Sequence, residues 1–475
     1  MDMRFLNRTN EMARLANLAK QGSGGLAVVW GRRRVGKTRL LLEWVAEQTG
    51  LYTVADQSAA DVQRRYFSEA LAGRFRGFHE AVYPDWSVLL RRLAQEAATE
   101  DWHGPLVLDE FPYLAATSPE LPSILQRWLE NEAAKAKLVV ALAGSSQRMM
   151  QGLVLPPSAP LYGRATEAMQ IEPLLPGYLA EGLDLSDPLD CVRAYAAWGG
   201  IPRYWELAAE CHDGLDSAVD RCVLDPLGPL HREPDRLLQE ETPPAVALRP
   251  ILDVIGLGAH RLSEIAGRIG QPATALARPL GRLLELGLVL RDRPYGEPEK
   301  GGKRALYRIA DPFVRMWFRV VAPHRALLAQ APAEARLVLW REAREALCSE
   351  AWEDLCRLCV ARLAGGESPL AKLGPWAPAG RYWSAGEPEW DVVAGSIDGR
   401  RLLLGEVKWS DRPVTVKEVA GIASELKAKG MPAAAKRCVE VTHAVFVPRV
   451  EKGAKTAMPE GCLILEAGEV LGVLR

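Results

Sequence analysis

A run of eight residues near the N-terminus has the composition of a phosphate-binding loop. Gly31-Arg-Arg-Arg-Val-Gly36-Lys37-Thr38 matches the pattern G-x-x-x-x-G-K-[ST] at every fixed position. Its glycines let backbone N–H groups turn toward phosphates, Lys37 is expected to reach the β- and γ-phosphates, and the Thr38 hydroxyl is expected to ligate Mg²⁺. An apolar stretch precedes the loop and an amphipathic one, Thr38–Gln48, follows it. The sequence therefore predicts a site for ATP or ADP with Mg²⁺ rather than a chance glycine-rich turn. The predicted nucleotide-binding set also includes Arg34, Val35 and Arg39.

A second apolar stretch, which begins at Pro105, ends in the acids Asp109 and Glu110. Beside a phosphate site, Asp109 would hold Mg²⁺ through water, and Glu110 would act as general base on the attacking water. The alternative is a solvated acidic pair after a strand. Another apolar stretch ends at Gly144-Ser145-Ser146, where Ser145 could sense the γ-phosphate, although serine is also a common turn residue.

A third set of charged residues lies near the C-terminus. Asp391 falls on one expected strand and Glu406 and Lys408 on a later one, where residues two apart point to the same face. Two carboxylates are hard ligands for Mg²⁺, and a lysine can stabilise charge on water or phosphate. Glu353, on a preceding helix, is a further metal-ligand candidate, although neighbouring acids could take its place. The alternative for Glu406 and Lys408 is an exposed ion pair on an edge strand.

Five short apolar stretches alternate with helical ones in residues 26–171, which predicts a parallel sheet covered by helices. The fold class is therefore α/β, with a P-loop domain over residues 1–175. A mostly helical lid is expected over 176–242. The expected strands of the sheet are Leu26–Trp30, Leu51–Val54, Leu106–Leu108, Leu138–Ala143 and Ala168–Ile171.

Residues 243–322 read as three helices and then two strands, Leu288–Arg291 and Ala305–Ile309, which is a winged helix-turn-helix pattern. The stretch 249–308 holds 11 Lys or Arg and 6 Asp or Glu, a local excess of five positive charges. Arg278 and Arg282, one turn apart, suggest contacts with DNA phosphates, whereas Pro279 would kink or shorten their helix. The alternative is a winged helix that packs on the ATPase core or on another protein.

The last expected domain, residues 323–475, has the element order αβββαβ. This order, together with Asp391, Glu406 and Lys408, resembles the core of PD-(D/E)XK nucleases. The expected elements are helix Glu342–Leu363, strands Arg381–Ser384, Trp390–Ala394 and Arg401–Trp409, helix Thr415–Lys429 and strand Ala444–Val447.

Several motifs together resemble the archaeal-type P-loop ATPases of the STAND branch of the AAA+ group. Phe5-Leu-Asn-Arg8-Thr-Asn-Glu11 is similar to the opening motif of that family, whose arginine lies near the nucleotide. The phosphate loop, the acidic pair and the serine segment match its Walker A, Walker B and sensor positions. Leu161-Tyr-Gly163-Arg164 resembles its Gly-Arg motif, which implies that Arg164 completes the γ-phosphate site; a surface salt bridge is the alternative. Gly199-Gly200-Ile201-Pro202 resembles its G-x-P element, which abuts the nucleotide.

The segment from Tyr307 to Phe318 resembles the one that follows the winged helix in family members fused to a nuclease-like domain. The resemblance implies an ATP-dependent regulator joined to a metal-dependent DNA nuclease that acts on foreign or mobile DNA. The alternative is a nucleotide-switched signalling or scaffold protein whose C-terminal domains only bind partners. Assembly of several copies of the chain stays open.

Length and charge limit these possibilities. A chain of 475 residues is too long for one hydrophobic core, and a net charge of -1 predicts no bulk attraction to nucleic acid or membrane. The absence of an apolar run of about 18 residues, or of a signal-peptide pattern, predicts no membrane partner. Eight dispersed cysteines, with Cys356 and Cys359 as buried core thiols, suggest a reducing cytoplasm.

Overall fold

The computed structural model describes residues 4–145, 147–154, 156–241, 248–298, 304–363, 368–432 and 440–475. The chain forms two compact units. One comprises Phe5–Pro173 and Ile201–Arg203, and the other comprises Met1–Arg4, Leu174–Gly200 and Tyr204–Arg475. Among the described residues, none of the helices combines the length and the apolar character needed to cross a membrane.

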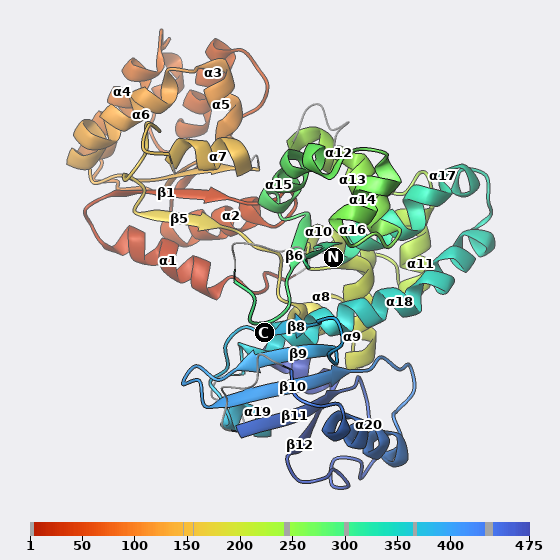
Figure 1. Ribbon diagram of the computed structural model, residues 1–475. Coiled ribbons are helices and arrows are strands. Elements are labelled where there is room, and N and C mark those ends of the chain that lie inside the picture. The colour runs from red at the N-terminus through yellow and green to blue at the C-terminus, as the bar shows by residue number, and fades with distance from the viewer. Residues whose placement is uncertain are drawn as a thin grey trace. The chain divides into compact units, whose positions relative to one another are not determined.

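The first unit is built on a five-stranded parallel sheet with the order β2-β3-β4-β1-β5. All five strand predictions are confirmed to within one residue at each end. Side chains alternate across the sheet: Leu26, Val28 and Trp30 join a large apolar core with residues of α3, α4 and α6, whereas Ala27 and Val29 are buried on the other face. Figure 1 shows helices α3, α4 and α6 together on one side of β1. The strands are β1 (Gly25–Trp30), β2 (Leu51–Val54), β3 (Leu106–Asp109), β4 (Val139–Gly144) and β5 (Glu167–Gln170). The helices are α1 (Thr9–Lys20), α2 (Lys37–Gln48), α3 (Ala60–Leu71), α4 (Trp86–Thr99), α5 (Phe111–Thr117), α6 (Leu121–Trp128) and α7 (Gln147–Val154).

The second unit begins with short helices and then adds a helical layer with an antiparallel hairpin, β6 (Val289–Asp292) with β7 (Leu306–Ile309). Pro279 is the third residue of α15, so it lies in the first helical turn, where backbone N–H groups have no intrahelical acceptor. The proline thus fits near the start of the helix, and no kink is needed. The helices are α8 (Leu179–Gly182), α9 (Pro188–Trp198), α10 (Pro202–Ala209), α11 (Leu215–Val219), α12 (Glu233–Glu241), α13 (Arg249–Gly256), α14 (Leu262–Ile269) and α15 (Ala277–Glu285).

Two short helices, α16 (Pro312–Met316) and α17 (Ala322–Leu328), lead to the 28-residue α18 (Ala333–Val360). The predicted helix is therefore correct in kind but begins nine residues earlier than expected. Cys356 and Cys359 are buried on it, as predicted.

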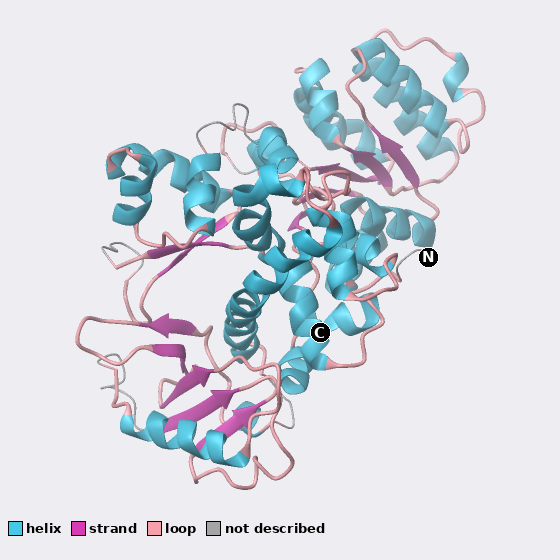
Figure 2. Ribbon diagram, turned by 90° about the vertical axis from the view of Figure 1, so that its right-hand side faces the viewer, coloured by secondary structure: helices cyan, strands magenta, loops and turns pink. Residues whose placement is uncertain are grey.

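The rest of the second unit is a five-stranded mixed sheet with the order β12-β11-β10-β9-β8, seen in Figure 2. Strands β8, β9 and β10 are antiparallel neighbours, and β11 and β12 continue parallel to β10. The expected αβββαβ order occurs, with β12 and α21 in addition. The elements are α19 (Pro369–Lys372), β8 (Gly380–Tyr382), β9 (Trp390–Gly395), β10 (Arg401–Val407), α20 (Val416–Ala428), β11 (Glu440–Phe446), β12 (Cys462–Leu465) and α21 (Ala467–Val473).

Candidate functional site

The phosphate loop connects the end of β1 to the start of α2, as predicted. Gly31 has φ +155°, and a side-chain carbon there would lie 2.5 Å from the Ile171 carbonyl oxygen. Gly36 has φ +98° and caps the N-terminus of α2. Both positions need glycine, the first for space and the second for its left-handed backbone. The helix N-terminus that follows favours negative charge, so the loop is suited to bind phosphate.

Lys37 lies inside this loop and is buried. Its Nζ donates to the carbonyl oxygens of Gly31 at 2.8 Å and Arg32 at 3.2 Å, and to Ser145 Oγ at 3.1 Å. Ser145 directly follows β4, which pairs with β1 in the sheet. The ammonium group therefore joins the loop to the end of the neighbouring strand.

Asp109 ends β3 with its carboxylate almost completely buried. Its Oδ2 accepts hydrogen bonds from Thr38 Oγ1 at 2.8 Å and from the Tyr52 hydroxyl at 2.7 Å, and its Oδ1 accepts one from the Glu110 amide at 2.8 Å. Burial, together with the hydrogen bond to Asp109, raises the pKa of Tyr52, so this phenol stays protonated at neutral pH. The hydroxyl and carboxylate oxygens suit a hard divalent ion such as Mg²⁺.

Glu110 adopts φ +52°, an uncommon backbone conformation for a residue other than glycine. Its Oε1 accepts from the Ser145 hydroxyl at 2.7 Å and its Oε2 from the Ser145 amide at 3.3 Å. Ser145 thus joins Lys37 to Glu110. Ser146, the last residue of the predicted sensor segment, lies outside the described residues.

Arg8, which directly precedes α1, contacts the backbone of the phosphate loop. It is buried, pairs with Glu11 at 3.0 Å, and donates to the carbonyl oxygens of Val35 at 3.0 Å and Glu172 at 2.8 Å. Burial lowers the pKa of Arg8, and Glu11 opposes that shift. Arg8 therefore holds the backbone of the loop.

Three other predicted nucleotide residues lie at or near the loop. A side-chain carbon at Gly36 would lie 3.6 Å from Pro202 Cγ, so the proline lies against the loop. Arg34 adopts φ +66° within the loop, and Arg39 lies on α2, where it pairs with Glu43 at 3.5 Å.

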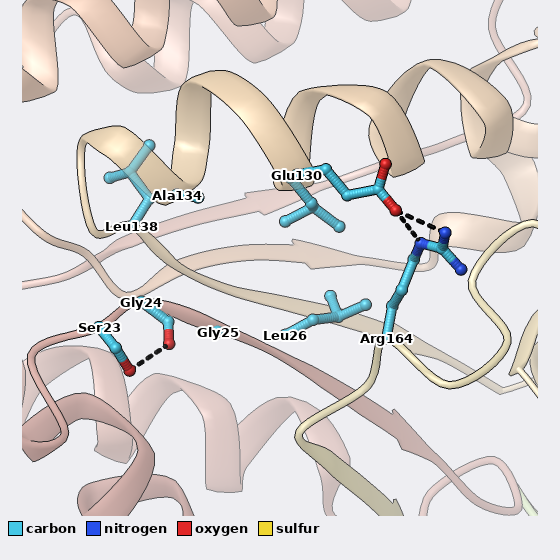
Figure 3. Close-up of a pocket in the computed structure, with 9 residues that line it drawn as sticks. Ser23, Gly24, Gly25, Leu26, Glu130, Ala134, Leu138 and Arg164 are labelled. Atoms are coloured by element: carbon cyan, nitrogen blue, oxygen red, sulfur yellow. Dashed lines mark hydrogen bonds and ion pairs between the residues drawn. The ribbon is translucent and has the colours of Figure 1, made fainter.

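Arg164 is not brought to the nucleotide loop of its own chain, contrary to the expectation that it completes the γ-phosphate site. It lies three residues before the first residue of β5, Glu167, which pairs in parallel with Ala27 near the start of β1, whereas the loop follows the end of β1. Arg164 pairs with Glu130 at 2.5 Å (Figure 3), which is the surface salt bridge left as the alternative. Both residues line a cavity of about 190 Å³ together with Ser23, Gly24, Gly25, Leu26, Leu129, Ala134 and Leu138.

A second group of charged side chains lies on the C-terminal sheet. Asp391 on β9 accepts a hydrogen bond from the Val407 amide of β10 at 3.0 Å. Glu406 on β10 has an ammonium partner at each oxygen: Lys408 Nζ lies 2.8 Å from Oε1, and Lys429 Nζ lies 2.5 Å from Oε2. We call Asp391, Glu406, Lys408 and Lys429 the carboxylate centre. Lys429 follows α20 and also lies 4.9 Å over the Trp390 ring; it was not predicted from the sequence.

The two carboxylates of the centre differ in their electrostatics. Burial raises the pKa of Asp391, the Val407 amide opposes this shift, and the nearby Glu406 adds to it. Burial also disfavours the charge of Glu406, but its hydrogen bonds to Lys408 and Lys429 lower its pKa overall. Glu406 is thus the carboxylate whose charge two lysines compensate, whereas the pKa of Asp391 is raised even though Arg381 and Lys429 oppose the shift.

Glu353 on α18 does not bond the centre directly. Its Oε2 lies 3.2 Å from Arg357 Nη1, which also donates to the Asp391 carbonyl oxygen at 3.2 Å. Across the described ranges, no cluster of three His, Cys, Asp or Glu side chains is arranged to hold a metal ion. The two carboxylates of the centre are still ligands of the type that Mg²⁺ prefers. This ion is often bound by one or two carboxylates and completes its coordination shell with water and phosphate oxygens.

Comparison with known proteins agrees with the geometry of the loop. Residues 5–207 match the family model described as an ATPase domain predominantly from Archaea. This part of the chain is therefore similar to an ATPase domain, which supports ATPase function. Farther along the chain, residues 317–422 match a family described as archaeal and bacterial proteins of unknown function.

Two relatives extend this similarity along the chain. An uncharacterized protein of Methanocaldococcus jannaschii is 27% identical over 409 residues, which cover 86% of this chain and 88% of the relative. The Walker-type ATPase of Pyrococcus abyssi matches with a TM-score of 0.53 and 19% identity, over 66% of this chain and 96% of its own. The second similarity is one of fold. Together these findings support ATPase function and imply nucleotide binding.

Proposed function

We propose that this chain is an ATP-dependent regulator of a Mg²⁺-dependent DNA nuclease centre in its C-terminal domain. The observation that carries the ATPase part is the hydrogen-bonded group of Lys37, Thr38, Asp109, Glu110 and Ser145. These residues come from three separate segments of the chain and meet at the carboxyl ends of β1, β3 and β4, where open α/β sheets bind their ligands.

Each of these residues has a role in the proposed hydrolysis. The loop amides and Lys37 bind the β- and γ-phosphates, while Thr38 and Asp109 hold the Mg²⁺. The bound ion supplies positive charge to the phosphate oxygens. Glu110 accepts the proton of the attacking water, and Ser145, which bridges Glu110 and Lys37, aligns the base with the phosphate.

The nuclease part rests on topology and on side-chain chemistry. A long helix followed by β8–β10, α20 and β11 has the element order of PD-(D/E)XK nucleases. In this proposal Asp391 and Glu406 would supply the two metal-binding acids, and Lys408 would stabilise charge on phosphate or water. Elements α13–α15 with the β6–β7 hairpin would serve as a winged helix, in which the exposed Arg278 and neighbouring Arg282 would contact DNA phosphates. Foreign or mobile DNA is the proposed substrate.

A specific observation favours a second candidate, a nucleotide-switched scaffold whose C-terminal domain only binds partners. Both oxygens of Glu406 already have lysine partners, so the carboxylate is balanced without a metal. A binding module would keep this arrangement for stability alone.

Cleavage of DNA by the full-length chain distinguishes the two functions. The nuclease proposal expects nicking that needs Mn²⁺ or Mg²⁺ and is lost in Asp391→Ala. Asp398→Ala is the matched control, because Asp398 is an exposed acid in the turn after β9. Nicking that persists in Asp391→Ala, or its absence from wild-type protein with either metal, would leave only the scaffold function.

A further inference from the structure

Asp354 on α18 is an anion surrounded by three arginines. Its carboxylate lies 2.9 Å from Arg308 Nη1, 2.7 Å from Arg315 Nη2 and 3.0 Å from Arg357 Nη2. Burial would raise the pKa of Asp354, but the arginines outweigh burial and lower it, so the carboxylate stays charged at neutral pH. We call these four residues the Asp354 cluster.

Two of the arginines tie the cluster to the β6–β7 hairpin. Arg308 lies on β7, and its Nε pairs with Asp292 of β6 at 2.6 Å. Arg315 lies on α16, and its guanidinium donates to the carbonyl oxygen of Ile309, the last residue of β7, at 3.1 Å. Asp354 is therefore contacted by Arg308 of β7 and by Arg315 of the following helix, while β6 is linked to it through the Asp292–Arg308 pair.

The third arginine ties the cluster to the carboxylate centre. Arg357 Nη2 pairs with Asp354, while its Nη1 donates to the carbonyl oxygen of Asp391 at 3.2 Å and to Glu353 at 3.2 Å. Only 15% of the Arg357 side chain is exposed, so few waters could replace these partners. The backbone position of Asp391 thus depends on a side chain whose own position depends on Asp354.

The electrostatics make this arrangement sensitive to loss of its central anion. Removal of one partner from a buried ion pair leaves an uncompensated charge, which is costly and forces its neighbours to rearrange. Without the Asp354 charge, Arg315 and Arg357 would lose their shared anion. Arg315 would still pair with Glu350, and Arg357 with Glu353.

We propose that Asp354 and Arg357 are positioning residues that couple the β6–β7 hairpin to the carboxylate centre. A ligand that moves the hairpin would then move Asp391 through Arg308, Asp354 and Arg357. The coupling deepens the proposed function, on which it rests for what the centre does, but it can be measured without any cleavage.

Hydrogen exchange measured by mass spectrometry on the full chain tests the coupling. In Asp354→Asn, amides of β6–β7 and those of β9–β10 around Asp391 and Val407 should both exchange at least about fivefold faster, because local opening then costs less. Arg357→Gln should accelerate exchange at β9–β10 only, since it leaves the Arg308–Asp354 pair in place. Glu350→Gln is the matched control on the same helix: Glu350 pairs with Arg315 and Arg319 but not with Arg357, so β9–β10 should be unchanged.

Two patterns would overturn the coupling. One is faster exchange in the hairpin alone for Asp354→Asn, and the other is unchanged β9–β10 exchange in Arg357→Gln. Peptides of β1 and β4 serve as an internal reference for folding; if Asp354→Asn fails to fold, Arg357→Gln alone decides. Wild-type protein that shows no metal-dependent nicking would defeat the nuclease proposal and leave these exchange patterns as they are.

Discussion

At the residue scale, the proposed ATPase site contains two sets of hydrogen bonds, and these end on the consecutive acids Asp109 and Glu110. Tyr52 and Thr38 both donate to Asp109, whereas Lys37 and Ser145 form a chain that ends on Glu110. In the proposed mechanism, the first set of hydrogen bonds holds the metal ligand Asp109 and the second holds the base Glu110. This division predicts that substitutions separate nucleotide binding from hydrolysis.

Loss of the loop cation should weaken binding. Lys37→Ala removes a buried ammonium that faces the phosphates, so ATP affinity measured by calorimetry should fall at least about tenfold. Lys20→Ala is the control, because Lys20 is exposed in the last turn of α1 and is not among the predicted nucleotide-binding residues. Equal ATP affinity in Lys37→Ala and wild type would contradict the assignment of the loop.

Loss of the base should stop hydrolysis without loss of binding. Glu110→Gln keeps the shape and can still bond Ser145, but it cannot take a proton, so phosphate release should slow by about 10²-fold or more. ATP affinity should stay near that of wild type. The exposed Glu120→Gln serves as the control. A wild-type rate in Glu110→Gln would mean that another group is the base.

Lys429 offers a test of the carboxylate centre. Its ammonium holds Glu406 Oε2, a position that a divalent ion would also need. Lys429→Met should therefore let Mn²⁺ raise the melting temperature of the full chain at about tenfold lower concentration than in wild type. Lys427→Met is the control, because Lys427 bonds the Glu460 carbonyl instead. An unchanged Mn²⁺ midpoint would show that Lys429 and the metal do not compete.

At the element scale, the sequence predicts the first sheet almost completely because its three central strands, β1, β3 and β4, are buried on both faces and read as short apolar runs. The C-terminal sheet is less predictable: β12 is a four-residue strand after a turn-rich stretch, and the first turns of α18 mix charged and apolar residues. Sequence order also places the two acids on their strands, whereas Lys408 directly follows β10, which ends at Val407, two residues earlier than expected. It cannot reveal Lys429, Tyr52 or Arg357, whose contacts depend on how separate elements pack.

The helix α15 carries a prediction of its own. If Arg278 and Arg282 contact DNA phosphates, the double alanine variant should bind duplex DNA less tightly. The slope of the logarithm of its binding constant against the logarithm of the salt concentration should become shallower, by about 0.9 for each of the two lost phosphate contacts. Arg268→Ala on α14 is the control, because this arginine bonds the Leu257 carbonyl. Identical salt slopes for the variant and wild type would favour the alternative in which this segment packs on the ATPase core or a partner.

At the scale of the whole molecule, the proposal requires two sites that can be inactivated one at a time. Asp391 has a raised pKa because it is buried and lies near Glu406, so a divalent ion beside it should relieve repulsion and stabilise the chain. Asp391→Asn should abolish the Mn²⁺-dependent gain in melting temperature and leave ATP hydrolysis intact. Lys37→Ala should keep the Mn²⁺-dependent gain in melting temperature but bind ATP much more weakly.

Cleavage then tests whether the sites are linked. A regulator predicts that nicking by wild-type protein changes with ATP or ADP, and that Lys37→Ala nicks at one constant rate whatever nucleotide is added, because its centre is intact but receives no signal. Two independent activities would instead give nicking by wild-type protein at a rate that does not depend on nucleotide.

Reciprocity of the coupling supplies a second measurement. If ATP alters binding of Mn²⁺ and DNA at the carboxylate centre, these ligands must alter ATP affinity by the same factor. Calorimetry of ATP binding to wild-type protein, with and without Mn²⁺ and DNA, would detect this change. An ATP affinity unaffected by Mn²⁺ and DNA, alongside nucleotide-independent nicking, would leave an ATPase and a nuclease on one chain with no regulation between them.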